Sequence, residues 1–172
     1  ILDRNIELHP EDSNAYNARA LINLTRFGGE CTDAYSDIRS AEKKGGDQET
    51  LLIGAAVYNN CGDAKEAIGR LKELLKIIPN DPGWFQTGFL ATLLYWNNQH
   101  EEIFKLIGQN INAEDMDRRV LAIYAIFEFE KNNEEKAKSF YQRALKNGLR
   151  RDQLTSKYYP DISEKTIQIL DK

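Results

Sequence analysis

Two cysteines are the residues of this sequence best suited to nucleophilic or redox chemistry, and both stand beside turn signals. Cys61 follows two asparagines and precedes Gly62-Asp63, a pair typical of a turn that starts a helix. Cys31 follows the Gly28-Gly29 pair after one residue. A polar setting of this kind is compatible with a reactive thiol, but it is equally that of an ordinary turn residue. The question is decided by the elements around the two cysteines.

Few other residues point to catalysis. His9 precedes a proline at a predicted helix end, and His100 lies in a predicted turn, so both are expected to be exposed. The sequence has no CxxC, HxxxH or HExxH spacing, and no nucleophile elbow, phosphate-binding loop or dinucleotide fingerprint. We therefore predict that the chain is not an enzyme and that it has no metal site and no cofactor.

Composition and charge narrow the class of protein. The chain has 172 residues, of which 41% are hydrophobic and 29% charged, as in ordinary soluble folded proteins. A net charge of −4 argues against nucleic-acid binding through this region. No apolar run approaches the roughly 18 residues of a membrane span, so we predict no membrane insertion. The sequence starts inside a predicted helix at Ile1, which predicts a piece of a longer chain. Cytoplasmic and periplasmic locations both fit.

A repeated pattern of two amphipathic helices organises the chain. In the clearest unit, residues 48–81, Ala55 and Tyr58 share one face of the first helix, and Ala67 and Leu71 share one face of the second. Pro79 is predicted to end the second helix, because proline lacks an N–H and clashes with the preceding turn.

The same spacing recurs along the sequence. The small residues that mark the first helix are separated by 35, 36 and 34 residues; they are Ala20, Ala55, Ala91 and Ala125. Since no such unit can bury its apolar face alone, neighbouring units are expected to stack.

This spacing resembles the tetratricopeptide repeat. The matching residues are Leu51, Ala55, Tyr58, Gly62-Asp63, Ala67 and Pro79 in one unit, and Leu121, Tyr124, Ala125, Asn133, Ala137, Tyr141 and Ala144 in another. Residues that depart from the pattern are Gly54, Phe104, Asn110 and Leu149. The resemblance covers nearly the whole chain and implies an all-α fold: a TPR-like α-solenoid, a right-handed superhelix of antiparallel helix pairs.

The repeat register predicts one array over residues 1–172. Residues 1–12 correspond to the end of an upstream repeat, and the repeats are 13–47, 48–81, 84–117 and 118–151. Residues 152–172 are predicted to form a C-terminal capping helix that begins at Asp161 or Ser163.

In this arrangement the two cysteines lie in the turns of adjacent repeats, and those turns stack along one edge. Cys31 and Cys61 could therefore form a disulfide, which would indicate an oxidising compartment such as the periplasm. The other interpretation, two unpaired thiols in turns, is the one we favour from the sequence.

The binding surface is the remaining candidate for function. The resemblance implies that the inner helices line a concave groove, whose exposed residues are Asn14, Asn17, Leu21, Asn59, Asn60, Phe85, Tyr95, Trp96 and Arg119. Asparagines can bond an extended peptide backbone, and aromatic rings supply contact area. Alternatively, Phe85, Tyr95 and Trp96 fill the core of the irregular third repeat.

These features predict a non-catalytic scaffold that binds a peptide or protein partner. The segment that follows Asn80, including Pro82-Gly83-Trp84, is similar to the TPR regions of bacterial transcriptional regulators, which implies a larger regulatory protein. Two alternatives remain: a self-association module that forms a homodimer, and a small-molecule sensor domain.

Overall fold

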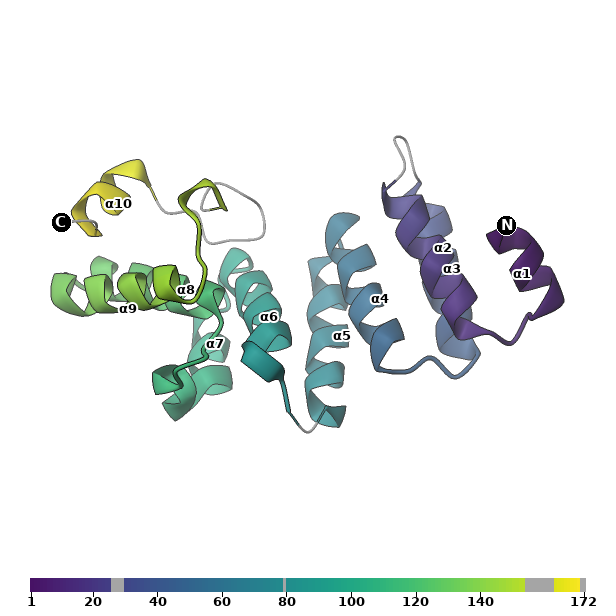
Figure 1. Cartoon of the computed structure of the whole chain (residues 1–172), viewed down its shortest axis with the longest axis horizontal. Helices are drawn as coiled ribbons and strands as arrows, with labels where there is room; N and C mark the ends of the chain where they lie inside the picture. The colour runs from purple at the N-terminus through teal and green to yellow at the C-terminus, as the bar shows by residue number, and fades with distance from the viewer. Residues whose placement is uncertain (26–29, 79, 154–162, 171–172) are drawn as a thin grey trace. The chain divides into compact units, whose positions relative to one another are not determined.

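The computed structural model describes residues 1–25, 30–78, 80–153 and 163–170. Every regular element in these ranges is a helix, which confirms the predicted all-α class (Figure 1). None of these helices combines the length and the apolar character that crossing a membrane requires. The chain divides into two compact units, Ile1–Pro79 and Asn80–Lys172, which are described separately as unit 1 and unit 2.

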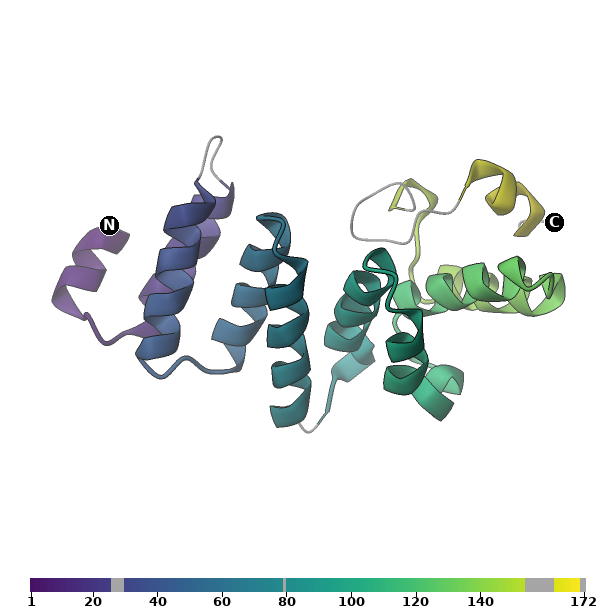
Figure 2. The same cartoon turned by 180° about the vertical axis from the view of Figure 1, so that it is seen from behind.

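Unit 1 is built from helical hairpins. Its helices are α1 (Leu2–Leu8), α2 (Ser13–Thr25), α3 (Cys31–Lys43), α4 (Gln48–Asn60) and α5 (Ala64–Ile77). Helix α2 packs along α3, and α4 packs along α5 (Figure 2). Helix α4 also contacts both α2 and α3, so the two hairpins share one core.

Aspartates start three of these helices. The Asp47 carboxylate accepts hydrogen bonds from the first-turn amides of α4, and Asp63 and Asp12 act in the same way for α5 and α2. Between α4 and α5, Gly62 adopts φ +85°, a left-handed conformation that suits glycine and ends α4 tightly. The predicted Gly28-Gly29 turn and Pro79 lie outside the described residues.

Small residues let the helices of unit 1 approach closely. The fully buried alanines are Ala20, Ala34, Ala41, Ala55 and Ala67, and the larger side chains packed with them are Ile38, Leu71 and Leu74. Alanine at a crossing places two helix backbones near each other, and the longer aliphatic side chains fill the remaining space.

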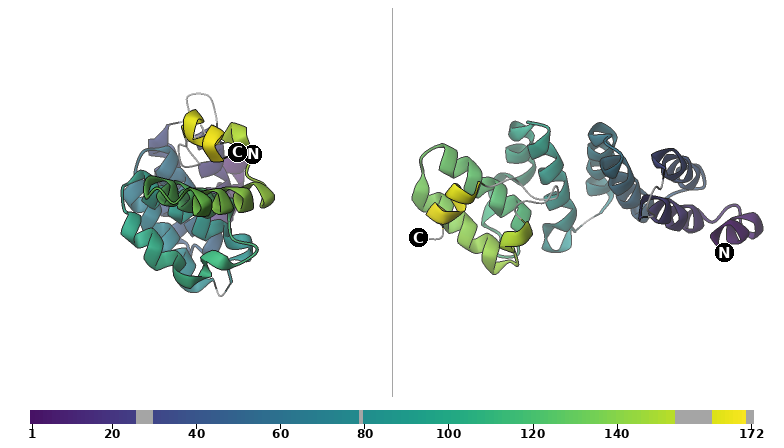
Figure 3. Two further views of the ribbon diagram at one scale, coloured as in Figure 1. Left: turned by 90° about the vertical axis from the view of Figure 1, so that its left-hand side faces the viewer. Right: turned by 90° about the horizontal axis from the view of Figure 1, so that it is seen from above.

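Unit 2 has longer connections between its helices. Its elements are η1 (Pro82–Trp84), α6 (Phe85–Trp96), α7 (His100–Ile107), η2 (Gly108–Asn112), α8 (Arg118–Glu130), α9 (Glu134–Lys146), η3 (Arg151–Gln153) and α10 (Glu164–Leu170). Helix α8 packs along α9 and against α6, and α6 contacts α7 (Figure 3). The core of unit 2 is formed by Leu90, Leu94, Ile103, Ile107, Leu121, Ile123 and Tyr141.

Helix α10 lies within the range predicted for a capping helix and contacts α9. The Ser163 hydroxyl accepts a hydrogen bond from the Thr166 amide at 3.1 Å, so Ser163 caps the helix start. The alternative cap, Asp161, lies outside the described residues. Leu170 is buried.

Helix pairs occupy the predicted repeat ranges 13–47, 48–81, 84–117 and 118–151. The range 84–117 is the least regular, because α7 ends at Ile107 and a 3-10 helix follows. The stacking of these pairs into one right-handed superhelix remains a prediction from the resemblance to tetratricopeptide repeats.

Candidate functional site

A cluster of aromatic rings reaches the surface of unit 2. We call it the aromatic patch and define it as Tyr95, Trp96, His100, Phe104 and Phe127. Trp96 is 44% exposed and Phe104 39%, whereas Tyr95 and His100 are half-buried. Phe127 is buried beneath them, and its ring centroid lies 5.0 Å from those of His100 and Phe104 and 6.0 Å from that of Tyr95.

Three helices supply these rings. Tyr95 and Trp96 end α6, His100 begins α7 with Phe104 one turn later, and Phe127 lies in α8. The turn between α6 and α7 is fixed by backbone hydrogen bonds from Asn98 to Tyr95 and from Gln99 to Leu94. The Tyr95 ring then stacks on His100 with centroids 5.5 Å apart and meets Trp96 edge-on at 5.7 Å. The patch is therefore held in place before any partner binds.

Charged side chains border the patch at the end of α8. The Lys131 ammonium lies 5.5 Å from the centroid of the Phe104 ring and 3.1 Å from a Glu128 carboxylate oxygen. The Asn133 side-chain amide donates to the other Glu128 oxygen at 2.9 Å. The hydrogen bond from Asn133, aided by Lys131, lowers the pKa of Glu128 below its ordinary value. Next to Phe104, burial raises the pKa of Tyr124.

Phe85 and Arg119 form a separate junction where α6 and α8 begin. Phe85 is 52% exposed, and the Arg119 guanidinium lies 4.7 Å from its ring centroid. Arg119 also donates to the Phe85 carbonyl at 2.6 Å and to both oxygens of Asp117 at 2.9 Å. Arg119 is only 9% exposed. The expectation that Arg119 is exposed is therefore wrong: its hydrogen bonds to Asp117, the N-cap of α8, hold the side chain inside the unit.

The binding residues predicted in unit 1 do not share one environment. Asn14 and Asn60 are exposed, Asn59 is half-buried and Leu21 is 38% exposed. The Asn60 side-chain amide donates to the Ala56 carbonyl at 2.8 Å.

Asn17 is a second correction. It is 2% exposed, and its side-chain amide donates to the Thr50 hydroxyl at 2.9 Å, which links α2 to α4. Asn17 therefore joins helices inside unit 1 and is not presented at its surface.

Of the nine predicted binding residues, Tyr95 and Trp96 enter the aromatic patch. Sequence reasoning did not assign His100, Phe104 or Phe127 to it. Phe104 carried a usable signal, since a large ring replaces the expected small residue there. Phe127 carried another, because it follows Tyr124 by three residues and so lies near the same helix face.

A polar cavity of about 590 Å³ opens beside α1, α2 and α3 in unit 1. The Arg19 guanidinium donates to both oxygens of the buried Asp37 carboxylate and to Asp3. Hydrogen bonding to Asp37 raises the pKa of Arg19 above its ordinary range. The Arg19–Asp37 ion pair therefore joins α2 to α3. Within the described ranges, no three His, Cys, Asp or Glu side chains are grouped to hold a metal ion.

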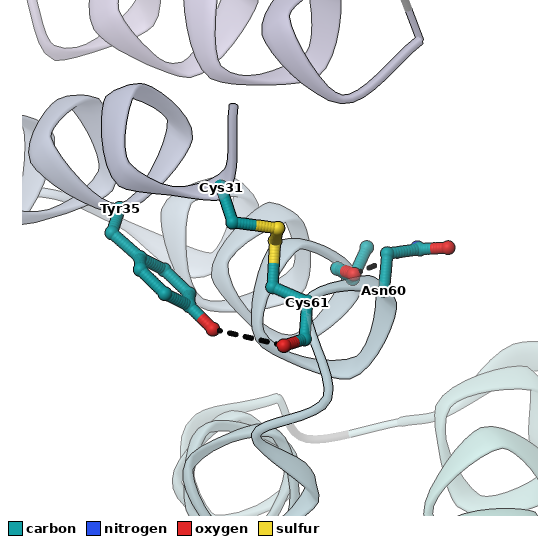
Figure 4. The surroundings of a disulfide bond; sticks show 5 residues. Cys31, Tyr35, Asn60 and Cys61 are labelled. Atoms are coloured by element: carbon teal, nitrogen blue, oxygen red, sulfur yellow. Dashed lines mark hydrogen bonds between the residues drawn. A yellow bond between two sulfur atoms is a disulfide. The ribbon is translucent and has the colours of Figure 1, made fainter. Parts of the chain in front are cut away.

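Cys31 and Cys61 form a disulfide in unit 1, with their Cα atoms 5.7 Å apart (Figure 4). The interpretation favoured from the sequence, two unpaired thiols, is therefore wrong. Cys31 is the first residue of α3, and Cys61 follows the last residue of α4. Beside the bond, the Tyr35 hydroxyl donates to the Cys61 carbonyl at 3.5 Å, and the Tyr35 ring stacks on Tyr58 with centroids 5.0 Å apart.

No family model, curated protein or solved structure matches this chain. The resemblance to tetratricopeptide repeats therefore rests on the repeat spacing described above.

Proposed function

We propose that this chain is a non-catalytic scaffold that binds a peptide or protein partner, as the TPR region of a larger bacterial regulatory protein. The proposal is supported by helix pairs at a spacing of 34 to 36 residues and by a preorganised aromatic surface on unit 2. The aromatic patch is the observation that carries it.

The patch has the composition and rigidity of a binding hot spot. Aromatic side chains are enriched at protein interfaces, where they contribute a large contact area for few rotatable bonds. Here Trp96 and Phe104 expose close to half of their surface, while Phe127 and Tyr95 restrict their neighbours from behind. Because the rings are already ordered, little conformational entropy is lost when a partner covers them.

The border of the patch indicates the chemistry of the partner. An apolar side chain of a partner can cover the exposed ring of Trp96 or of Phe104 and displace water from it. Asn98 is exposed in the adjoining turn and can bond the backbone of an extended segment, whereas the Asn97 side-chain amide already donates to the Leu93 carbonyl at 2.8 Å. We therefore propose a partner segment that presents an apolar anchor followed by accessible backbone groups.

Selection from a displayed library of random peptides tests this proposal. Peptides enriched on the intact chain should carry an aromatic or large aliphatic residue at one position. The Kd of a synthetic enriched peptide, measured by fluorescence anisotropy, should rise about 10- to 30-fold in Trp96→Ala and in Phe104→Ala, the loss expected of a hot-spot residue.

Phe85→Ala is the matched control. It removes a ring that is more exposed than Trp96 or Phe104 from the opposite end of α6, so peptide affinity should stay within about twofold. The proposal fails if no peptide is enriched, or if Trp96→Ala and Phe104→Ala bind as well as the unmodified chain. Sedimentation over a range of protein concentrations tests the competing role, self-association. If the unmodified chain is a dimer and Trp96→Ala is a monomer, the aromatic patch is a dimer interface.

A further inference from the structure

The Cys31–Cys61 disulfide joins two helix ends of opposite polarity. We propose that it is a thiol–disulfide exchange site, in which an incoming thiolate attacks Sγ of Cys61 and Cys31 departs as the thiolate. The co-reactant belongs to the class of small or protein thiols, of which glutathione is the simplest probe. The inference is independent of the proposed function, because the disulfide lies in unit 1 and the aromatic patch in unit 2.

Cys31 stands where a thiolate is favoured. It is the first residue of α3, and the amides of a first helical turn carry a partial positive charge. The N-cap residue, Glu30, makes no side-chain hydrogen bond to this turn. Helix N-termini are among the environments that lower the pKa of a cysteine thiol. Cys31 is therefore the better leaving group.

Cys61 stands at the opposite kind of helix end. It is the C-cap residue of α4, and its amide donates to the Val57 carbonyl at 3.0 Å. The final carbonyl groups of a helix carry a partial negative charge, which disfavours a second negative charge beside them. Asp63, two residues later, carries a carboxylate. Expulsion of Cys61 as the thiolate is therefore less favourable than expulsion of Cys31.

Other charged and titratable groups lie near both ends of the bond. Glu30, the N-cap residue, and Asp33 in the first turn of α3 oppose a thiolate at Cys31, but both are exposed, so the surrounding water weakens their effect. Burial raises the pKa of Tyr35, whose hydroxyl donates to the Cys61 carbonyl; Asp63 and then Tyr58 raise this pKa further, and Arg39 lowers it.

Exchange proceeds in two balanced steps. Glutathione thiolate forms a bond to Cys61 Sγ as the Cys31–Cys61 bond breaks, and the electron pair stays on Cys31, which then takes a proton from water. A second glutathione thiolate attacks the glutathione sulfur of this mixed disulfide and releases Cys61. Two glutathione molecules are thereby oxidised to one disulfide, and the protein gains two thiols.

The intermediate identifies which sulfur is attacked. The intact chain, purified without reductant, is mixed with glutathione, quenched with iodoacetamide and mapped by mass spectrometry. We expect glutathione on Cys61 and the carbamidomethyl group on Cys31, with this isomer at least several-fold more abundant than its reverse. The proposal is overturned by a predominance of the reverse isomer, by two free thiols in the purified protein, or by exchange that starts only in denaturant.

Single-cysteine variants provide a second measurement. Cys61→Ser leaves the Cys31 thiol, and Cys31→Ser leaves the Cys61 thiol. The pH at which alkylation reaches half its maximal rate should be lower for Cys31, by roughly one pH unit or more. In urea the two midpoints should coincide, which serves as the control. Equal midpoints in variants that retain native helical circular dichroism would contradict the proposal. If a variant does not fold, the glutathione experiment still tests the proposal, because it uses the unmodified chain.

Discussion

At the residue scale, the Glu128 carboxylate links stability to pH. Its pKa is lowered in the folded chain by hydrogen bonds from Asn133 and Lys131, so the folded state binds its proton more weakly than the unfolded state does. The resulting stabilisation is fully present above the ordinary pKa of 4.5 and is lost as the pH falls through the lower, folded-state value.

We therefore expect Glu128→Gln to lower the free energy of unfolding at pH 7 and to approach the unmodified chain as the pH falls below about 4.5. Urea unfolding at a series of pH values measures this. Glu130→Gln removes an equivalent charge from the exposed end of the same helix and should show no such convergence. A Glu128→Gln deficit that stays constant down to pH 3 would show that lost packing, not lost charge, explains it.

Arg119 and Asn17 show where residue-scale reasoning from the sequence stops. Helical periodicity places a residue on one face of a helix, but it does not show whether that face packs against a group that can hydrogen-bond to the residue. Arg119 donates hydrogen bonds to Asp117, two residues earlier, and to the Phe85 carbonyl of α6. Asn17 donates a hydrogen bond to Thr50 on α4. Each contact satisfies a polar group that would otherwise remain in water, so both side chains become buried. Leu21, Phe85 and Trp96, whose side chains are mainly apolar, remain exposed.

At the element scale, α5 offers opposite effects on two faces of one helix. Ala67 is fully buried where α5 packs on α4, whereas a Cβ added at Gly69 would meet no neighbouring atom. We expect Ala67→Leu to cost about 1–3 kcal/mol through overpacking. Gly69→Ala should stabilise the chain by about 0.5–1 kcal/mol, because alanine loses less backbone freedom in a helix.

Urea unfolding of both variants measures the two changes against the same reference. Opposite signs are the expected result. If Ala67→Leu unfolds at the same urea concentration as the unmodified chain, the small-residue crossing between α4 and α5 is not the close contact described here.

Local signals in the sequence predicted most helices but not the irregular elements of unit 2. Asp47 and Asp63 are recognisable caps, and the alternation of small and large residues identifies the helix pairs. Trp84 is different. It adopts a left-handed conformation with φ 56°, and its indole donates to Asp115 at 3.2 Å, 31 residues away. Such a conformation is rare for a large residue, and the contact that accompanies it is not local, so no periodic pattern reveals it.

At the scale of the whole molecule, the repeat period predicted one array, whereas the fold divides into two compact units at Pro79. A period of 34 to 36 residues indicates that each helix pair has an apolar face that a neighbouring pair must bury. It carries no information about how strongly one pair is coupled to the next. The unfolding of each unit can be followed separately, because the disulfide lies in unit 1 and the tryptophans lie in unit 2.

The disulfide lies in unit 1, and both tryptophans, Trp84 and Trp96, lie in unit 2. Reduction reopens a loop of 30 residues, which should cost unit 1 about 3–4 kcal/mol by the chain-entropy estimate and lower its Tm by roughly 10 °C or more. With dithiothreitol present, helical circular dichroism should therefore show an earlier transition. Tryptophan fluorescence, which reports on unit 2 alone, should keep its original midpoint.

Cys31→Ser/Cys61→Ser controls for direct effects of the reductant, and it should melt in the same way with and without dithiothreitol. If the fluorescence midpoint instead falls together with the circular dichroism, loss of a bond in unit 1 destabilises unit 2, and the chain unfolds as one cooperative array. That outcome would favour the single array predicted from the sequence. Unequal midpoints would show that the apolar faces are covered mainly within each unit, because only weak coupling lets one unit melt while its neighbour stays folded.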